Sequence, residues 1–223
     1  MDYSPVLISL KTASLSIILT FFLGILLARI LYKFSQSKIT FVIDSILTLP
    51  LVLPPTVAGF FLLIIFGVNR PIGKFLIEFF GVKVVFNWSA TVIAAVAISF
   101  PLMYRSAMAA FEQVDINLIY AARTLGMSEN KIFWKILMPN AKPGIISGAI
   151  LSFARGLGEF GATLMIAGNI AGKTRTLPVA VYSAAAGGDM ETANKYVIIL
   201  VGISFIVVAL MNYISSRQRR KKG

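Results

Sequence analysis

Cysteine and histidine are both absent from this sequence of 223 residues, and charged residues make up only 13% of it. Without cysteine the chain can form no disulfide and has no thiolate to act as a metal ligand or nucleophile. Without histidine it lacks the commonest metal ligand and the side chain that most readily transfers protons near neutral pH. We therefore expect no metal site, no bound cofactor and no catalytic residues, so the chain is not expected to be an enzyme.

The low charge accompanies a hydrophobic fraction of 57%. Soluble domains carry roughly 25% charged residues, about twice the fraction in this chain. A helix needs roughly 20 apolar residues to cross the bilayer core, and stretches of this kind recur along the sequence. The composition predicts an all-α, multi-pass membrane protein with one domain over residues 1–223. Its five predicted transmembrane helices are Thr12–Leu31, Ile46–Phe66, Trp88–Met108, Gly144–Ala167 and Tyr196–Ile214.

The basic residues predict the orientation of these spans. The net charge is +12, and basic residues gather in the cytoplasmic loops of membrane proteins. With the N-terminus outside and the C-terminus inside, the basic run 217–222 and the polar loop 109–143 both face the cytoplasm. The protein is then placed in the cytoplasmic (inner) membrane, and its positive charge reflects topology rather than nucleic-acid binding. On the outer side, Lys74–Phe80 is apolar enough for a short interfacial helix.

The second span contains three prolines, Pro50, Pro54 and Pro55, followed by Thr56. Proline removes a backbone donor and its ring clashes with the preceding turn, so the helix must bend or begin irregularly here. Such a bent helix can line a translocation path, or the bend can serve packing alone. The sequence leaves both interpretations open.

The fourth span holds two ionisable residues, Arg155 and Glu159, in an otherwise apolar segment. At positions i and i+4 they share a helix face and can pair with each other. They either fix the bundle as an ion pair or lie beside the translocation path, where Arg155 would offset an anion's charge weakly and transiently. Small residues every four positions also predict close packing against a helix of the same or another protomer. These small residues are Gly144, Gly148, Ser152 and Gly156.

The first half of the loop 109–143 predicts a short amphipathic helix. Asp115 can cap a helix that begins at Ile116. Gly126 suits the left-handed position that ends it. The apolar residues expected on one face of this helix are Leu118, Ala121, Ala122 and Leu125.

The second half of the loop predicts another short helix, Glu129–Leu137, capped by Ser128. Pro139 is expected to end this helix, and Pro143 suits the first turn of the fourth span. Its apolar face comprises Ile132, Phe133, Ile136 and Leu137. Amphipathic helices at this position can lie on lipid headgroups or enter a groove on a partner, and composition alone favours neither.

The spacing in this loop resembles the signature loop of the permease subunits of ATP-binding-cassette (ABC) importers. That pattern reads Glu-Ala-Ala, three residues, Gly, nine residues, then Ile-x-Leu-Pro, and Ala121-Ala122, Gly126 and Ile136–Pro139 match its spacing. Tyr120 stands where the pattern has glutamate, and Met138 where it has leucine. The resemblance implies that the loop docks in a cleft of a separate ATPase. The residues expected to couple to the ATPase are Tyr120, Ala121, Ala122, Arg123, Thr124, Leu125, Gly126, Ile136 and Pro139.

The resemblance extends to one branch of these importers, the molybdate permeases, through Leu49–Gly59, Ala121–Gly126 and Ala154–Thr163. It implies the type I importer (MetI-like) architecture and a homodimer of permeases in the lipid bilayer. The implied partners are a ModC-like ATPase, which binds the ATP, and a ModA-like extracytoplasmic binding protein. The implied substrate is an oxyanion, molybdate first, with sulfate and tungstate as alternatives. Candidates for the translocation path or for packing between spans are Pro50, Pro54, Pro55, Thr56, Arg155, Gly158, Glu159, Gly161 and Thr163.

Two other classes of protein are alternatives to an ABC permease. A channel or secondary carrier would need no nucleotide-binding partner, but the halves of the chain show no visible repeat of the kind found in inverted-repeat carriers. A membrane enzyme would have too few catalytic candidates, with nine acidic residues and no histidine or cysteine. Gly172-Lys173-Thr174 nearly completes a phosphate-binding loop, but the glycine required five residues earlier is Ala167. We expect this outer segment, up to about Asn194, to meet the binding protein instead.

The purified chain alone should hydrolyse no ATP, because the ATP is expected to bind to the partner subunit. Phosphate release in detergent, measured with and without the ATPase, tests this expectation. ATP hydrolysis that survives removal of every partner would contradict the assignment.

Overall fold

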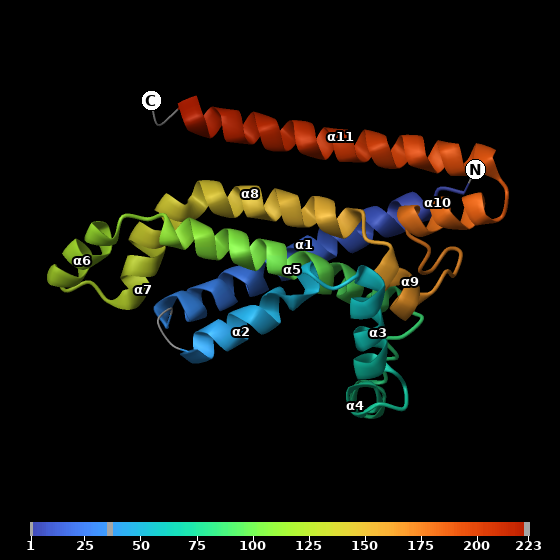
Figure 1. The fold of residues 1–223 in the computed structure, drawn as a ribbon, viewed down its shortest axis with the longest axis horizontal. Helices are drawn as coiled ribbons and strands as arrows, with labels where there is room; N and C mark the ends of the chain where they lie inside the picture. The colour runs from blue at the N-terminus through green and yellow to red at the C-terminus, as the bar shows by residue number, and fades with distance from the viewer. Residues whose placement is uncertain (1, 35–37, 221–223) are drawn as a thin grey trace.

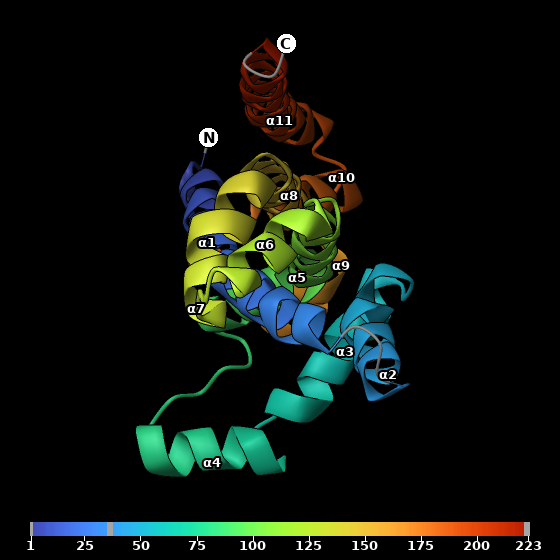
Figure 2. The ribbon, with the colours of Figure 1, turned by 90° about the vertical axis from the view of Figure 1, so that its left-hand side faces the viewer.

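The computed structural model describes residues 2–34 and 38–220, and every regular element in these two ranges is a helix (Figure 1). Long helices lie side by side at the centre of the molecule. They are α1 (Ser4–Lys33), α5 (Trp88–Glu112) and α8 (Met138–Leu157). A further long helix, α11 (Met190–Arg220), runs along the outside of this group and contacts α8, as Figure 2 shows from the end of the bundle.

Short elements connect the long helices. They are α2 (Lys38–Thr48), the 3-10 turn η1 (Leu49–Leu51), α3 (Pro55–Phe66), α4 (Pro71–Phe80), α6 (Ile116–Thr124), α7 (Glu129–Ile132), the π-helical segment η2 (Phe133–Leu137), α9 (Gly161–Ala167) and α10 (Leu177–Ala186). The loop helices α6 and α7 lie at one end of the bundle, whereas α9 and α10 lie at the other (Figure 1). The segments expected inside and outside therefore occupy opposite ends, while the orientation itself stays a prediction.

The all-helical membrane fold predicted from the sequence is confirmed. Three helices in the described ranges are long and apolar enough to cross a membrane: α1, α5 and the part of α11 from Met190 to Leu210. Two pairs of bent helices raise the number to five if each pair counts as one span. The predicted count of five therefore matches only when broken helices are accepted as spans.

The unbroken helices extend beyond the spans drawn from hydropathy. α1 begins at Ser4 rather than Thr12, and α5 begins at Trp88 as predicted but ends at Glu112 rather than Met108. The fifth predicted span likewise lies inside α11. Hydropathy locates only the stretch that suits the bilayer core. A helix extends beyond this stretch wherever its backbone hydrogen bonds continue.

The expected outer helix is present as α4, which begins at Pro71 rather than Lys74 because proline is well tolerated in the first turn. It ends at Gly81, whose φ of 65° is the left-handed conformation of a helix C-terminus. Phe79 and Phe80 are exposed, and the helix projects away from the bundle in both views (Figures 1 and 2).

The proline-rich second span is not one helix. The pair formed by α2 with η1 and by α3 bends by 113° at the prolines, where the sequence predicted a bend or an irregular start, and α2 begins at Lys38 rather than at Ile46. Pro54 has an extended backbone (ψ 134°), and Pro55 begins α3, where its missing N–H costs nothing. A change of direction this large makes α3 a separate helix, which packs mainly on α9.

The fourth span differs from its prediction at its start and in its continuity, whereas its end at Ala167 is as predicted. Its helix begins at Glu129, not at Gly144, and breaks before α9 with a bend of 57°. Pro139 therefore does not end the second loop helix. The π-helical turn opens the backbone just before this proline, with Met138 N–H donating to the carbonyl of Phe133, five residues back. This wider turn relieves the clash that proline causes in a regular helix and lets the chain continue.

The ridge of small residues packs within the chain. A Cβ added to Gly148 would lie 2.4 Å from Ser106 Cβ on α5, and one added to Gly144 would lie 2.7 Å from Ala110 Cβ. At Gly156 the nearest atom is Ser16 Oγ on α1, at 3.2 Å. The sequence left open which helix approaches here, and the structure identifies α5 and α1 of the same chain.

Buried hydroxyl pairs join α1 to α5. Thr12 Oγ1 lies 2.9 Å from Thr91 Oγ1, and Thr20 Oγ1 lies 3.2 Å from Ser99 Oγ. Small polar side chains of this kind let helices approach closely and satisfy each other in a medium without water. They fix α1 and α5 as a unit on which the remaining helices pack.

Replacing Gly148 with alanine should lower the free energy of unfolding by about 1–3 kcal/mol, because the new methyl group overpacks the contact with Ser106. Thermal unfolding in detergent measures the effect. Gly202→Ala is the matched control, since no atom lies within 4 Å of its added Cβ. Equal unfolding midpoints for the two variants would show that the close approach is unimportant.

Candidate functional site

The helix α6 has the two ends that the sequence predicted. Asp115 caps its start by accepting a hydrogen bond from Asn117 N–H at 2.9 Å. At its end Gly126 has a φ of 71°, with Gly126 N–H bonded to Arg123 O at 2.9 Å and Met127 N–H bonded to Ala122 O at 3.0 Å. These paired bonds form a Schellman motif, which requires a residue that tolerates the left-handed conformation.

The face that α6 buries differs from the predicted one. Ile119 and Ala122 are buried against the rest of the chain. Of the four residues predicted to share an apolar face, only Ala122 is buried, whereas Leu125 is 81% exposed and Leu118 is 45% exposed. Tyr120 is 55% exposed. The helix therefore presents an apolar surface outward while it anchors itself through the opposite side.

The second apolar face of the loop turns inward. Ile132, Phe133 and Leu137 are buried in the same hydrophobic cluster as residues of α1 and α5, and Ile136 is partly buried against it. Asn140 Nδ2 donates to the carbonyl of Ile136 at 2.7 Å. This apolar face is thus part of the bundle, whereas Trp134 and Lys135 of the same half are exposed.

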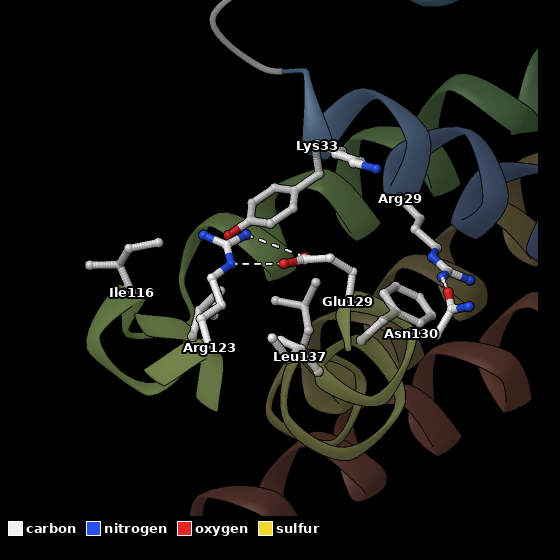
Figure 3. A pocket seen from close by; sticks show the side chains of 11 residues that line it. Arg29, Lys33, Ile116, Arg123, Glu129, Asn130 and Leu137 are labelled. Carbon is white, nitrogen blue, oxygen red and sulfur yellow. Dashed lines mark hydrogen bonds and ion pairs between the residues drawn. The ribbon is translucent and has the colours of Figure 1, made fainter. Parts of the chain in front are cut away.

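A cavity of about 300 Å³ lies between the end of α1 and the loop (Figure 3). Ser128 occupies the N-cap position of α7 as predicted, but its side chain makes no capping bond. Glu129 instead accepts from Arg123 through two hydrogen bonds, of 2.8 Å from Nε and 3.3 Å from Nη2. The cavity is lined by Arg29, Tyr32, Lys33, Ile116, Ile119, Arg123, Glu129, Asn130, Ile132, Phe133 and Leu137.

The candidate residues of the two broken spans meet each other. A Cβ on Gly161 would lie 3.1 Å from Thr56 N and 3.2 Å from Pro55 Cβ, which puts the start of α9 against the start of α3. Thr163 is buried in α9, whereas Thr56 and Pro54 are exposed. Pro50 lies apart from this contact, in η1, which packs on α5.

Arg155 and Glu159 form an ion pair, with Arg155 Nη1 2.8 Å from Glu159 Oε2. Glu159 lies at the break between α8 and α9 rather than inside a continuous helix, and Gly158 immediately precedes it. Its other oxygen accepts from Ala162 N–H at 2.8 Å, so this side chain, only 2% exposed, caps α9. The ion pair that the sequence allowed is therefore present, but it joins α8 to a residue just beyond its end.

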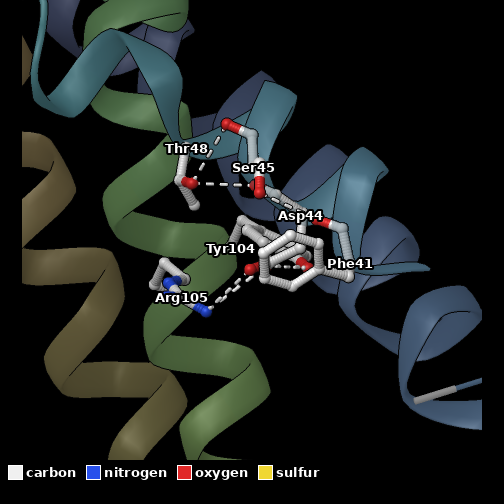
Figure 4. Close-up of polar contacts among 6 residues, drawn as sticks. All are labelled: Phe41, Asp44, Ser45, Thr48, Tyr104 and Arg105. Carbon is white, nitrogen blue, oxygen red and sulfur yellow. Dashed lines mark hydrogen bonds and ion pairs between the residues drawn. The ribbon is translucent and has the colours of Figure 1, made fainter. Parts of the chain in front are cut away.

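One polar cluster was missed from the sequence (Figure 4). Asp44 on α2 accepts from Tyr104 OH at 2.7 Å and lies 3.1 Å from Arg105 Nη1 on α5. Tyr104 is fully buried. A single acid in an apolar stretch and a single arginine near the end of a span were the available signals, but their contact depends on how α2 packs on α5. The cluster fixes the first half of the broken span on α5.

The sequence that nearly completes a phosphate-binding loop is a turn after α9. The side chain of Thr174 is fully buried and accepts a hydrogen bond from Ile170 N–H at 3.0 Å, and Gly172 has a φ of 70°. The element before the turn is a helix, whereas a nucleotide loop follows a strand. The residues therefore stabilise the turn.

The acidic residues of this outer segment are also committed to local contacts. Hydrogen bonds from Thr192 hold the pKa of Asp189 below its usual value, and Glu191 pairs with Lys195 at 2.6 Å. No group of three or more potential metal-ligating residues occurs in the described part of the chain.

Comparison with known proteins identifies this arrangement of helices. The structure superposes on a chain of the MetNI methionine ABC transporter in an inward-facing conformation with a TM-score of 0.76, 18% identity and coverage of 96% of this chain and 94% of that chain. A chain of an amino acid ABC transporter gives a TM-score of 0.67 at 20% identity, covering 95% and 91%. The chain therefore shares its fold with these ABC transporter chains.

The sequence comparisons then give the family. A family model described as the binding-protein-dependent transport system inner membrane component matches residues 20–220. The chain is 40% identical over 224 residues to the molybdenum transport system permease protein ModB of Escherichia coli (strain K12), covering 100% of this chain and 97% of that protein. It is 43% identical over 206 residues to the putative molybdenum transport system permease protein YvgM of Bacillus subtilis (strain 168), covering 92% and 90%. The chain belongs to the family of binding-protein-dependent transport system inner membrane components.

Replacing Gly126 with valine should uncouple transport. No atom lies within 4 Å of an added Cβ, so the cost is in the backbone, roughly 1–2 kcal/mol or more for a β-branched residue at a φ of 71°. Uptake driven by ATP should fall, because the joint between α6 and α7 is misplaced. Gly126→Asn is the control, since asparagine tolerates this conformation. Full ATP-driven uptake by the valine variant would contradict the role of the joint.

Proposed function

We propose that this chain is the permease subunit of an ABC importer that carries molybdate across the cytoplasmic membrane. The proposed substrate rests on the similarity of this chain to molybdenum permeases, with 39–43% identity over 92–100% of the chain. Identity spread over whole chains indicates a shared route for the same anion more strongly than a shared fold does. Sulfate and tungstate are the alternatives, because they are tetrahedral dianions of similar chemistry.

The proposed complex contains two copies of the chain, two ModC-like ATPase subunits and a ModA-like extracytoplasmic binding protein. The exposed surface of α6, with Leu118, Tyr120 and Leu125, is the proposed contact with the ATPase. A helix with an exposed apolar face fits the groove of a partner protein. ATP binds to the ATPase, and the chain itself contributes no nucleotide site. The segment from Gly168 to Asn194 is the proposed contact for the binding protein.

The proposed path for the anion passes the junction of α3 and α9. Exposed Thr56 lies at this junction, and Arg155 is 36% exposed while paired with Glu159. Because the carboxylate neutralises most of its charge, Arg155 attracts a dianion weakly. A weak site suits transport, since a strongly bound anion would be released slowly.

Uptake of labelled anions by a strain that lacks the chromosomal permease tests the proposal. Expression of the chain with its own ATPase and binding protein should restore uptake of molybdate, and an excess of unlabelled molybdate should abolish it. The complex with a hydrolysis-deficient ATPase is the control and should remain inactive. Uptake of sulfate without uptake of molybdate would show that the substrate is wrong while the importer is right.

A further inference from the structure

Two consecutive residues at the start of α7 hold two different helices (Figure 3). Glu129 accepts the two hydrogen bonds from Arg123 of α6, while Asn130 Oδ1 accepts a hydrogen bond from Arg29 Nη2 of α1. The guanidinium of Arg29 also lies over the ring of Phe133, 4.1 Å from its centre. The first turn of α7 is therefore fastened on one side to α6 and on the other to α1.

The cavity explains why these contacts matter. Ile116 and Ile119 of α6 line it on one side, and Tyr32 and Lys33 of α1 line it on the other. Beside the cavity, Ile119 and Ala122 of α6 share one hydrophobic cluster with Leu31 of α1 and with Phe133. The main contacts of α6 are with α7 and η2. Across the cavity itself, a displacement of α6 reaches α1 through Glu129 and Asn130 of α7, which bind Arg123 and Arg29.

The bridging contacts are poorly placed to stabilise the fold. The side chains of Arg123 and Glu129 are 49% and 55% exposed, and exposed ion pairs contribute little to stability. Their geometry is nevertheless specific, because a planar guanidinium bound by both carboxylate oxygens fixes the orientation of the two helices. Contacts that are weak in energy but specific in geometry suit the transmission of a small movement.

We propose that Arg123, Glu129, Asn130 and Arg29 are positioning residues that transmit the movement of α6 to α1. The proposal rests on the proposed function, in which the ATPase moves α6. α1 is joined to α5 by buried hydroxyl pairs and approaches α8 at Gly156. A pull on the end of α1 therefore moves the central helices, and closure of the ATPase is converted into rearrangement of the spans.

The number of anions taken up per ATP hydrolysed tests the proposal, measured on the complete importer in proteoliposomes. Asn130→Leu removes the acceptor for Arg29 and should lower this ratio by about fivefold or more, the range of a typical coupling between sites. Lys131→Ala is the matched control, because Lys131 is the exposed next residue and makes none of these contacts. Arg29→Lys, which keeps the charge without the planar fork, should give an intermediate ratio.

The pair of Arg123 and Glu129 provides a second, independent test of the proposal. Arg123→Glu alone should lower the ratio, and the exchanged variant Arg123→Glu with Glu129→Arg should restore it in part, which a general loss of stability would not do. Unchanged ratios in Asn130→Leu and Arg123→Glu, or no recovery in the exchanged variant, would overturn the proposal. If the unmodified complex hydrolyses ATP without taking up any oxyanion, the proposed function fails instead.

Discussion

The close approach of α1, α5 and α8 is the constraint on which the rest of the molecule depends. In a lipid medium helices gain little from hiding apolar surface, so contact depends on how near their backbones can come. Gly148 meets Ser106, and Gly24 meets Met103 at distances that leave no room for a Cβ. The resulting unit holds the loop at one end and the broken helices at the other.

Charged side chains hold the shorter helices in place, whereas small residues let the central helices approach one another. Asp44 fastens α2 to α5, and Glu159 caps α9 while it pairs with Arg155. Glu159 lies at the break between α8 and α9, whereas Asp44 lies within α2. Charged groups inside spans are costly and need partners, and each of these carboxylates forms an ion pair with an arginine. The breaks that follow η1 and α8 bring α3 and α9 together at the proposed path.

Local chemistry was predictable at several positions, although Ser128 makes no capping bond and Pro139 does not end its helix. Asp115, Gly126 and the prolines after Leu49 acted as predicted because their effects depend only on neighbouring backbone. The buried face of α6 was wrong because Ile119, not Leu118, faces the neighbouring helices, which periodicity cannot reveal. The size of the bend in the second span and the contact of Asp44 with Tyr104 depend on residues far apart in sequence. The coupling residues and the translocation residues remain predictions in their roles, although their positions are now known.

The π-helical turn at Phe133–Leu137 also determines how the loop is rotated about the helix axis relative to α8. Each residue of a regular helix turns the chain by about 100°, so one extra residue in a turn shifts everything beyond it by that angle. Phe133 and Gly156 both face α1 and α5, and the extra residue brings their directions into agreement along one helix. Deletion of a single residue here would give a more regular helix with the loop facing the wrong way. Sequence alignments of such proteins should therefore treat the length of this turn as fixed.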